Sequence, residues 1–281
     1  NKLIELEKIY AEFQNRFLKK MGAPSVNVKH FFNTIPMLAY VGSTDFQPAH
    51  ENINLYINAL YLHHLNPFNI FHECRHLCQH YNLDKIVNGN EIENNQKFIA
   101  FCLLFSHLYK DDALPYNLKV EELDANLYAY TINKQLIKKG YIKLQPDDEY
   151  FNTINIFSVL TDLEYKKDNY NKNFAKIIKF FNKSKKYIKQ TNLIDENLKK
   201  VLDSINPKLF VRYANRVLGE MYDDVYVFLK TKHSDKKDFF LPNGEINYSY
   251  QNHNFLVNQF KKYEKESNKQ FLNNQIAKLF L

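Results

Sequence analysis

The chain has 281 residues and a formal net charge of +7, and 45% of its residues are hydrophobic. This length suits one large domain or two modest ones. Only 6 glycines accompany 23 phenylalanines and 20 tyrosines, a composition that disfavours a turn-rich all-β fold. Three cysteines are too few for a disulfide framework and favour a reducing compartment.

The sequence predicts a cytoplasmic protein without membrane spans. No apolar run approaches the roughly 20 residues that cross a bilayer, and residues 1–7 lack the apolar core of a signal peptide. The positive net charge would favour an acidic partner such as nucleic acid. No DNA-binding motif in a suitable context accompanies that charge.

The predicted elements change in kind along the chain. An apolar stripe predicts a helix over residues 2–20. Short apolar runs then predict strands at 26–28, 37–41 and 52–58. The first turn of a helix tolerates proline. Asn66-Pro67 therefore predicts the start of a helix, which should end near Tyr81. Further helices are predicted at 96–109, 120–139, 150–167, 172–190, 196–204, 207–231 and 251–279, with a loop at 235–247.

Pro146 and the acidic run at 147–149 suggest a boundary between two domains. The sequence therefore predicts an α+β fold, in which residues 1–145 combine a small sheet with helices. Residues 146–281 would form a mainly helical accessory domain.

The segment His72-Glu73-Cys74-Arg75-His76 carries the strongest chemical signal. Two histidines at i and i+4 on a helix lie on one face, so both imidazoles can bind a single ion. A zinc ion there would lower the pKa of water to about 7, and Glu73 would act as general base. Phe71, Cys74 and Cys78 fall on the other side and should form the buried back of the helix. Two histidines that serve only packing or solvation are the alternative.

A catalytic zinc needs a third protein ligand and an open fourth position. Glu122 is the best candidate, because it shares a helix face with Ala125 and Ala129, whose small side chains would permit a close approach. Asn126, one turn further on, could accept a hydrogen bond from the outer nitrogen of a ligand histidine. A merely acidic, exposed helix face is the alternative for this segment.

The HExxH motif followed by Glu122-x-x-Ala125-Asn126 resembles the gluzincin-type zinc metallopeptidases. Within that class it resembles in particular the ImmA/IrrE-like peptidases common on phages and mobile elements, over residues 26–139. This resemblance implies a zincin-like catalytic domain, zinc as cofactor, Glu122 as a ligand and Asn126 as the support of a ligand histidine. Cys74-Arg75 stands where Leu-Gly is frequent in that group, and a long insertion precedes Glu122, so the substrate does not carry over. Membrane-bound CAAX-processing peptidases share a related pattern, but the lack of predicted spans argues against them.

The predicted function is therefore that of a zinc-dependent endopeptidase acting on a protein or peptide. The strand at 52–58 would pair with an extended substrate. Oxyanion stabilisation has four candidates, which are Tyr116, Tyr128, Tyr130 and His107. Two alternatives stay open: a zinc-dependent hydrolase of non-peptide amides, and a non-catalytic regulatory protein of a mobile element with a structural or vestigial metal site.

The second half adds one further candidate. Lysines surround an apolar set in the helix at 172–190. An amphipathic helix packed on the protein body explains this pattern, and a surface for nucleic acid or an acidic protein is the alternative.

Overall fold

A computed structural model gives the structure of part of the chain. It describes residues 15, 16, 19, 27–31, 54–58, 68–108, 114, 116–141, 144, 146–166, 172–191 and 193–263. Only the backbone is described for the residues at 27–31, 54–58, 69, 70, 73, 107, 117 and 147. The predicted strand at 37–41 lies outside the described residues, as do most of the predicted helix at 2–20 and residues 264–279 of the last predicted helix.

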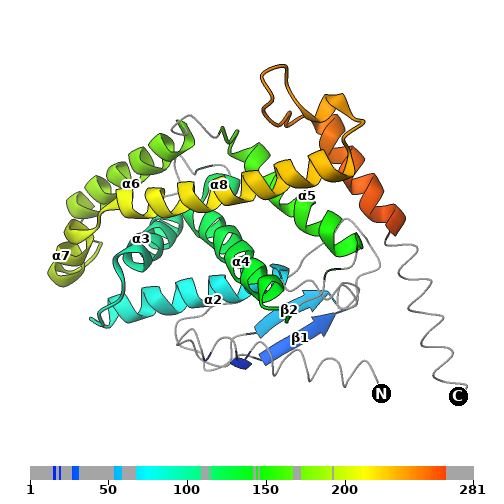
Figure 1. Cartoon of the computed structure of the whole chain (residues 1–281). Helices are drawn as coiled ribbons and strands as arrows, with labels where there is room; N and C mark the ends of the chain where they lie inside the picture. The colour runs from blue at the N-terminus through cyan, green and yellow to red at the C-terminus, as the bar shows by residue number, and fades with distance from the viewer. Residues whose placement is uncertain are drawn as a thin grey trace, which may run out of the picture. The chain divides into compact units, whose positions relative to one another are not determined.

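Helices make up most of the described residues (Figure 1). They are α2 (Phe68–Val87), α3 (Asn94–Leu108), α4 (Val120–Lys138), α5 (Pro146–Asp162), α6 (Lys172–Thr191), α7 (Glu196–Ser204), α8 (Pro207–Lys232) and a further helix at 250–263. Two 3-10 turns accompany them, η2 (Tyr116–Leu118) and η3 (Lys237–Phe239). Among the residues that the structure describes, no helix combines the length and the apolarity that a bilayer crossing requires.

The prediction of an α+β fold was wrong, because the described chain is mainly helical. Two five-residue strands, β1 (Asn27–Phe31) and β2 (Asn54–Asn58), form one parallel pair in which Asn27 lies opposite Asn54. So small a pair cannot provide a layer on which helices stack. Apolar runs of three to five residues fit a strand or a helix segment equally well by periodicity.

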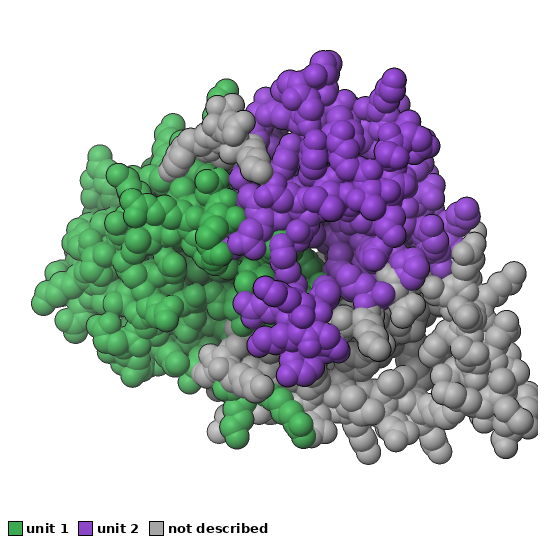
Figure 2. Space-filling model, in the orientation of Figure 1, with its two compact units in different colours: residues 1–133, 172–216 green, residues 134–171, 217–281 purple. Residues whose placement is uncertain are grey.

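The described chain forms two compact units (Figure 2). Unit 1 comprises residues 1–133 and 172–216, and unit 2 comprises residues 134–171 and 217–281. Segments distant in sequence therefore pack within each unit, and residues 172–216 belong to unit 1. Compact clusters of contacts need not coincide with domains that fold alone, so the predicted division at 145/146 stays a prediction.

Aromatic side chains build the core of unit 1. Phe98 on α3 lies 5.0 Å from Phe181 on α6 and 5.3 Å from Phe210 on α8, measured between ring centroids. Phe105, also on α3, lies 5.6 Å from Phe181. All four rings are buried. Such pairs add about 0.5–1.5 kcal/mol each beyond the area they bury, so the abundant phenylalanine of the sequence stabilises helix packing.

Helix α2 extends six residues beyond its predicted end at Tyr81, because Ile86 is buried and keeps the last turns on the core. The helix ends where Gly89 adopts a φ of 76°. There the backbone N–H of Gly89 donates to the carbonyl oxygen of Ile86 at 3.0 Å. The backbone N–H of Asn90 donates to the carbonyl oxygen of Lys85 at 2.9 Å. This glycine-terminated pattern is common at helix ends.

Helix α5 begins at Pro146, inside the stretch that was predicted to be a domain boundary. Proline suits the first helical position, where its missing N–H has no partner in any case. Pro146 therefore marks a helix start.

Candidate metal centre

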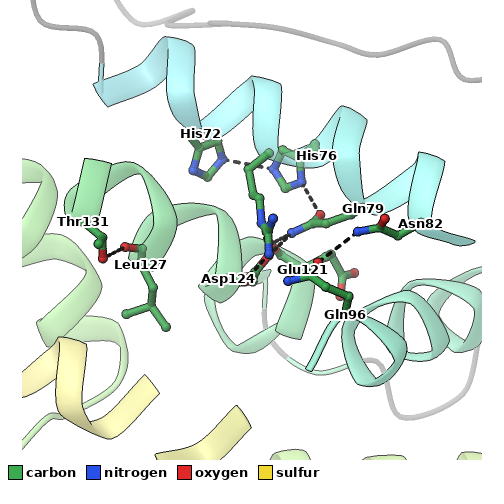
Figure 3. Close-up of polar contacts among 10 residues, drawn as sticks. His72, His76, Gln79, Asn82, Gln96, Glu121, Asp124, Leu127 and Thr131 are labelled. Carbon is green, nitrogen blue, oxygen red and sulfur yellow. Dashed lines mark hydrogen bonds and ion pairs between the residues drawn. The ribbon is translucent and has the colours of Figure 1, made fainter. Parts of the chain in front are cut away.

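Helix α2 presents a polar face that meets α4. Figure 3 shows the side chains of His72, His76 and Gln79 projecting from α2 toward α4. The opposite side of α2 is buried, as predicted, with Phe71 and Cys74 fully enclosed and Cys78 3% exposed. Burial of this apolar side fixes the orientation of α2 about its own axis. In that orientation both histidines point toward the same location.

Three donor atoms converge there. The Nε2 atoms of His72 and His76 lie 3.1 Å apart. Oε2 of Glu122 lies 3.5 Å from Nε2 of His72 and 3.6 Å from Nε2 of His76. A tetrahedral zinc ion holds nitrogen and oxygen ligands at about 2.0–2.1 Å, which places pairs of ligand atoms about 3.4 Å apart. The three separations are close to that value, so this group could hold a metal ion.

The three side chains are largely, but not fully, withdrawn from solvent. Those of His72 and His76 are each 15% exposed, and that of Glu122 is 12% exposed. Burial alone would raise the pKa of the Glu122 carboxyl, but when the two histidines are protonated, their hydrogen bonding and charge outweigh burial and hold this pKa well below its usual range. Glu122 is therefore ionised, as a metal ligand must be.

Gln79 orients His76. Nδ1 of His76 lies 2.9 Å from Oε1 of Gln79. The amide nitrogen of Gln79 donates to Oδ2 of Asp124 at 2.8 Å and to the backbone carbonyl of Glu121 at 2.9 Å. Since both amide hydrogens are used in this way, Oε1 is the acceptor and Nδ1 of His76 carries the proton. The lone pair of a neutral His76 then lies on Nε2, the atom beside His72 and Glu122.

A buried ion pair joins α2 to α4 next to this group. Nε of Arg75 donates to Oδ2 of Asp124 at 2.7 Å, and Nη2 donates to Oδ1 at 3.2 Å. The side chain of Asp124 is 1% exposed. The guanidinium of Arg75 also lies 4.7 Å from the ring centroid of Tyr128. This two-point contact restricts the orientation of α4 relative to α2. Asp124 lies two residues after Glu122 in the sequence, so the contact also restrains the position of Glu122.

The structure therefore brings together the three predicted ligands, but it leaves other assignments as predictions. The side chain of Glu73 lies outside the described residues, so its role as general base stays a prediction. Asn126 is half-buried on α4, and its supporting role stays a prediction, while Gln79 is the residue found at Nδ1 of His76. The same holds for the oxyanion candidates: Tyr128 packs on Arg75, Tyr130 is buried, Tyr116 is 62% exposed, and the side chain of His107 lies outside the described residues.

Sequence reasoning missed the roles of Gln79, Arg75 and Asp124. Gln79 could have been found, because it lies three residues after His76 and seven after His72, on the same helix face. The pairing of Arg75 with Asp124 had no such local signal. These residues lie 49 positions apart, and Asp124 is about 200° from Glu122 around a helix. Only the reach of the long Arg75 and Gln79 side chains brings Asp124 into the same network.

If this group binds a divalent metal ion, we expect Gln79→Ala to weaken that binding by about 10- to 100-fold, the usual effect of removing a partner that orients a ligand histidine. The matched control is Gln96→Ala, because Gln96 accepts a hydrogen bond from Asn82 between α2 and α3, away from the histidines. Competition with a chromogenic chelator would measure both affinities. Equal losses in the two variants would refute a specific role for Gln79.

Comparison of the chain with family models, with curated proteins and with solved structures finds no match. The chemistry of the group must therefore be judged from its donors. These are two imidazole nitrogens and one carboxylate oxygen, a set that zinc accepts and that other divalent transition metals also bind.

Proposed function

We propose that the chain is a zinc-dependent endopeptidase, with His72, His76 and Glu122 as zinc ligands and Glu73 as general base. The observation that supports this most directly is the convergence of three donor atoms at separations of 3.1–3.6 Å. Glu73 follows the first histidine directly, the position a general base occupies in an HExxH helix.

Three protein ligands are the number that a catalytic zinc site uses. Structural zinc sites are closed by four protein ligands, whereas catalytic sites keep a position open. Within the described part of the chain the metal-binding group has three members. Their side chains retain 12–15% exposure, which leaves the group within reach of solvent and of a small reactant.

Each residue has a distinct task in this proposal. Zinc, when bound, supplies Lewis-acid chemistry that polarises a carbonyl group and acidifies water. His76, held by Gln79, keeps its Nε2 lone pair available, and the ionised Glu122 offsets part of the ion's charge. Glu73 would take the proton from the attacking water and deliver it to the departing amide nitrogen. The resemblance to gluzincin-type peptidases favours a peptide bond as the target.

Zinc-dependent proteolysis is the direct test. We expect the purified chain to bind one zinc ion and to cleave an unstructured protein such as casein. A chelator such as 1,10-phenanthroline should abolish cleavage, and added zinc should restore it. Mass spectrometry of the new termini would separate peptide-bond cleavage from the hydrolysis of other amides. A zinc-loaded chain that cleaves no peptide but hydrolyses a non-peptide amide would overturn the proposal.

A matched pair of variants on α4 tests the third ligand. We expect Glu122→Gln to lose most of its zinc at micromolar free metal, because the neutral amide lacks the negative charge with which a carboxylate binds zinc. Glu121→Gln should retain its zinc, because the Glu121 side chain is directed to α3 and not to the two histidines. There its Oε1 accepts a hydrogen bond from the hydroxyl of Ser106 at 3.0 Å. Plasma mass spectrometry gives the metal content of each. Equal zinc content in the two variants would require a different third ligand.

A further inference from the structure

Helix α6 carries the whole net charge of the chain. It contains seven lysines and no acidic residue. The chain has 38 Lys and Arg residues, so 31 lie outside α6, against 31 Asp and Glu residues in the chain. The chain is therefore neutral apart from this one helix of 20 residues. A helix face that serves only solvation usually mixes charges of both signs, as the neighbouring α7 does with Glu196, Lys199, Lys200 and Asp203.

Five of the seven lysines form a straight stripe. They are Lys172, Lys176, Lys179, Lys183 and Lys186, at alternating intervals of four and three residues. At 100° and 1.5 Å per residue they fall within an arc of about 80° and span about 21 Å. All five are exposed. The other two, Lys185 and Lys189, lie to one side and pair with Asp203 of α7. We call the five residues the lysine stripe.

The remaining face of α6 is already occupied. Phe174, Ile177 and Ile188 are fully buried and Phe181 is 1% exposed, and Phe181 packs on Phe98 of α3. Helices that bind a bilayer surface insert their apolar face between the lipids. Since these apolar side chains lie in the core of unit 1, the exposed face of α6 consists mainly of lysines, with Tyr187 as its one large exposed hydrophobic side chain.

We propose that the lysine stripe binds the phosphate backbone of nucleic acid, without regard to base sequence. Duplex DNA carries one negative charge per about 1.7 Å of its axis, so 21 Å of duplex holds about a dozen phosphates on its two strands, and only part of these face the lysine stripe. Five lysines can each meet one, and the counterions released drive binding. A folded acidic protein rarely offers so dense a linear array of negative charge. This inference does not depend on the proposed peptidase activity.

Salt dependence gives the decisive experiment, with a labelled mixed-sequence duplex of about 25 base pairs as probe and fluorescence anisotropy as readout. For five phosphate contacts the slope of log K against log salt concentration should be about −4.5. The variant Lys176→Gln/Lys179→Gln/Lys183→Gln should reduce this slope to about −2 and weaken binding on the order of a hundredfold at 0.1 M salt. Its fold should persist, because the stripe is exposed.

The matched control removes three exposed lysines elsewhere, as Lys138→Gln/Lys139→Gln/Lys237→Gln. It has the same net charge as the stripe variant and should keep the slope of the unmodified chain. Equal slopes for the two triple variants would overturn the proposal, as would no binding to the duplex at 50 mM salt. Tighter binding to polyglutamate or to phosphatidylserine vesicles than to the duplex at equal salt would also overturn it. Zinc content, measured alongside, should be the same in all three proteins.

Discussion

The variant Glu73→Gln is expected to lower kcat for peptide hydrolysis by about 10²- to 10⁴-fold, the range that a positioned general base contributes. Glutamine keeps the length and shape of the side chain but cannot accept a proton. The chain should keep its zinc, because the proposed ligands His72, His76 and Glu122 are unchanged. The measurement compares initial cleavage rates at equal zinc occupancy.

A suitable control is Glu91→Gln, which makes the same chemical change at a side chain that is 90% exposed and pairs with Lys97. This control should cleave at the rate of the unmodified chain. If Glu73→Gln also retained that rate, Glu73 would not be the general base. If it lost zinc together with activity, its carboxylate would be acting as a ligand.

The variant Asp124→Ala is expected to lower the free energy of unfolding by about 3–5 kcal/mol, because it leaves the buried guanidinium of Arg75 without its counter-charge. It also removes an acceptor from Gln79. The control is Asp224→Ala, which breaks the ion pair between Asp224 and Lys134. These two side chains are 44% and 42% exposed, so the free energy of unfolding should fall by only about 0–1 kcal/mol. Urea unfolding with a chelator present would exclude any contribution from metal binding.

The double variant Arg75→Met/Asp124→Leu shows whether the instability of Asp124→Ala comes from the unpaired charge that it leaves on Arg75. Replacing both charges by apolar groups is often neutral or stabilising, so this protein should recover most of the stability that Asp124→Ala loses. Similar costs for Asp124→Ala and Asp224→Ala would contradict a structural role for the buried pair. Such an outcome would leave the orientation of α4 unexplained by this contact.

The candidate metal group could be predicted from sequence because its main determinants are local. The spacing of His72 and His76 fixes their separation on any continuous helix. Glu122 was found because Ala125 and Ala129 follow it on one face, where they permit close packing. Both alanines are fully buried in the structure. The spacing of the two histidines and the helix face of Glu122 could both be predicted from helix geometry alone, without knowledge of the rest of the fold.

The remainder of the fold depended on contacts between distant residues. The predicted sheet is reduced to the pair β1 and β2 among the described residues, and the aromatic contacts of Phe98 with Phe181 and Phe210 build a helical core instead. The sequence contains these phenylalanines but does not state which ones meet. Pro146 illustrates the same ambiguity, since one residue type marks both linkers and helix starts.

The burial of Cys74, Cys78 and Cys102 supplies an internal reporter for all of these experiments. Burial raises the pKa of the Cys78 thiol to about 12 and that of Cys102 well above its ordinary value. Neither of these two thiols therefore ionises near neutral pH, and all three are shielded from alkylating reagents while the helices stay closed. Iodoacetamide labelling followed by mass spectrometry would count how many become accessible. A variant that loses zinc without gaining label has lost a ligand, whereas one that gains label has opened α2 or α3.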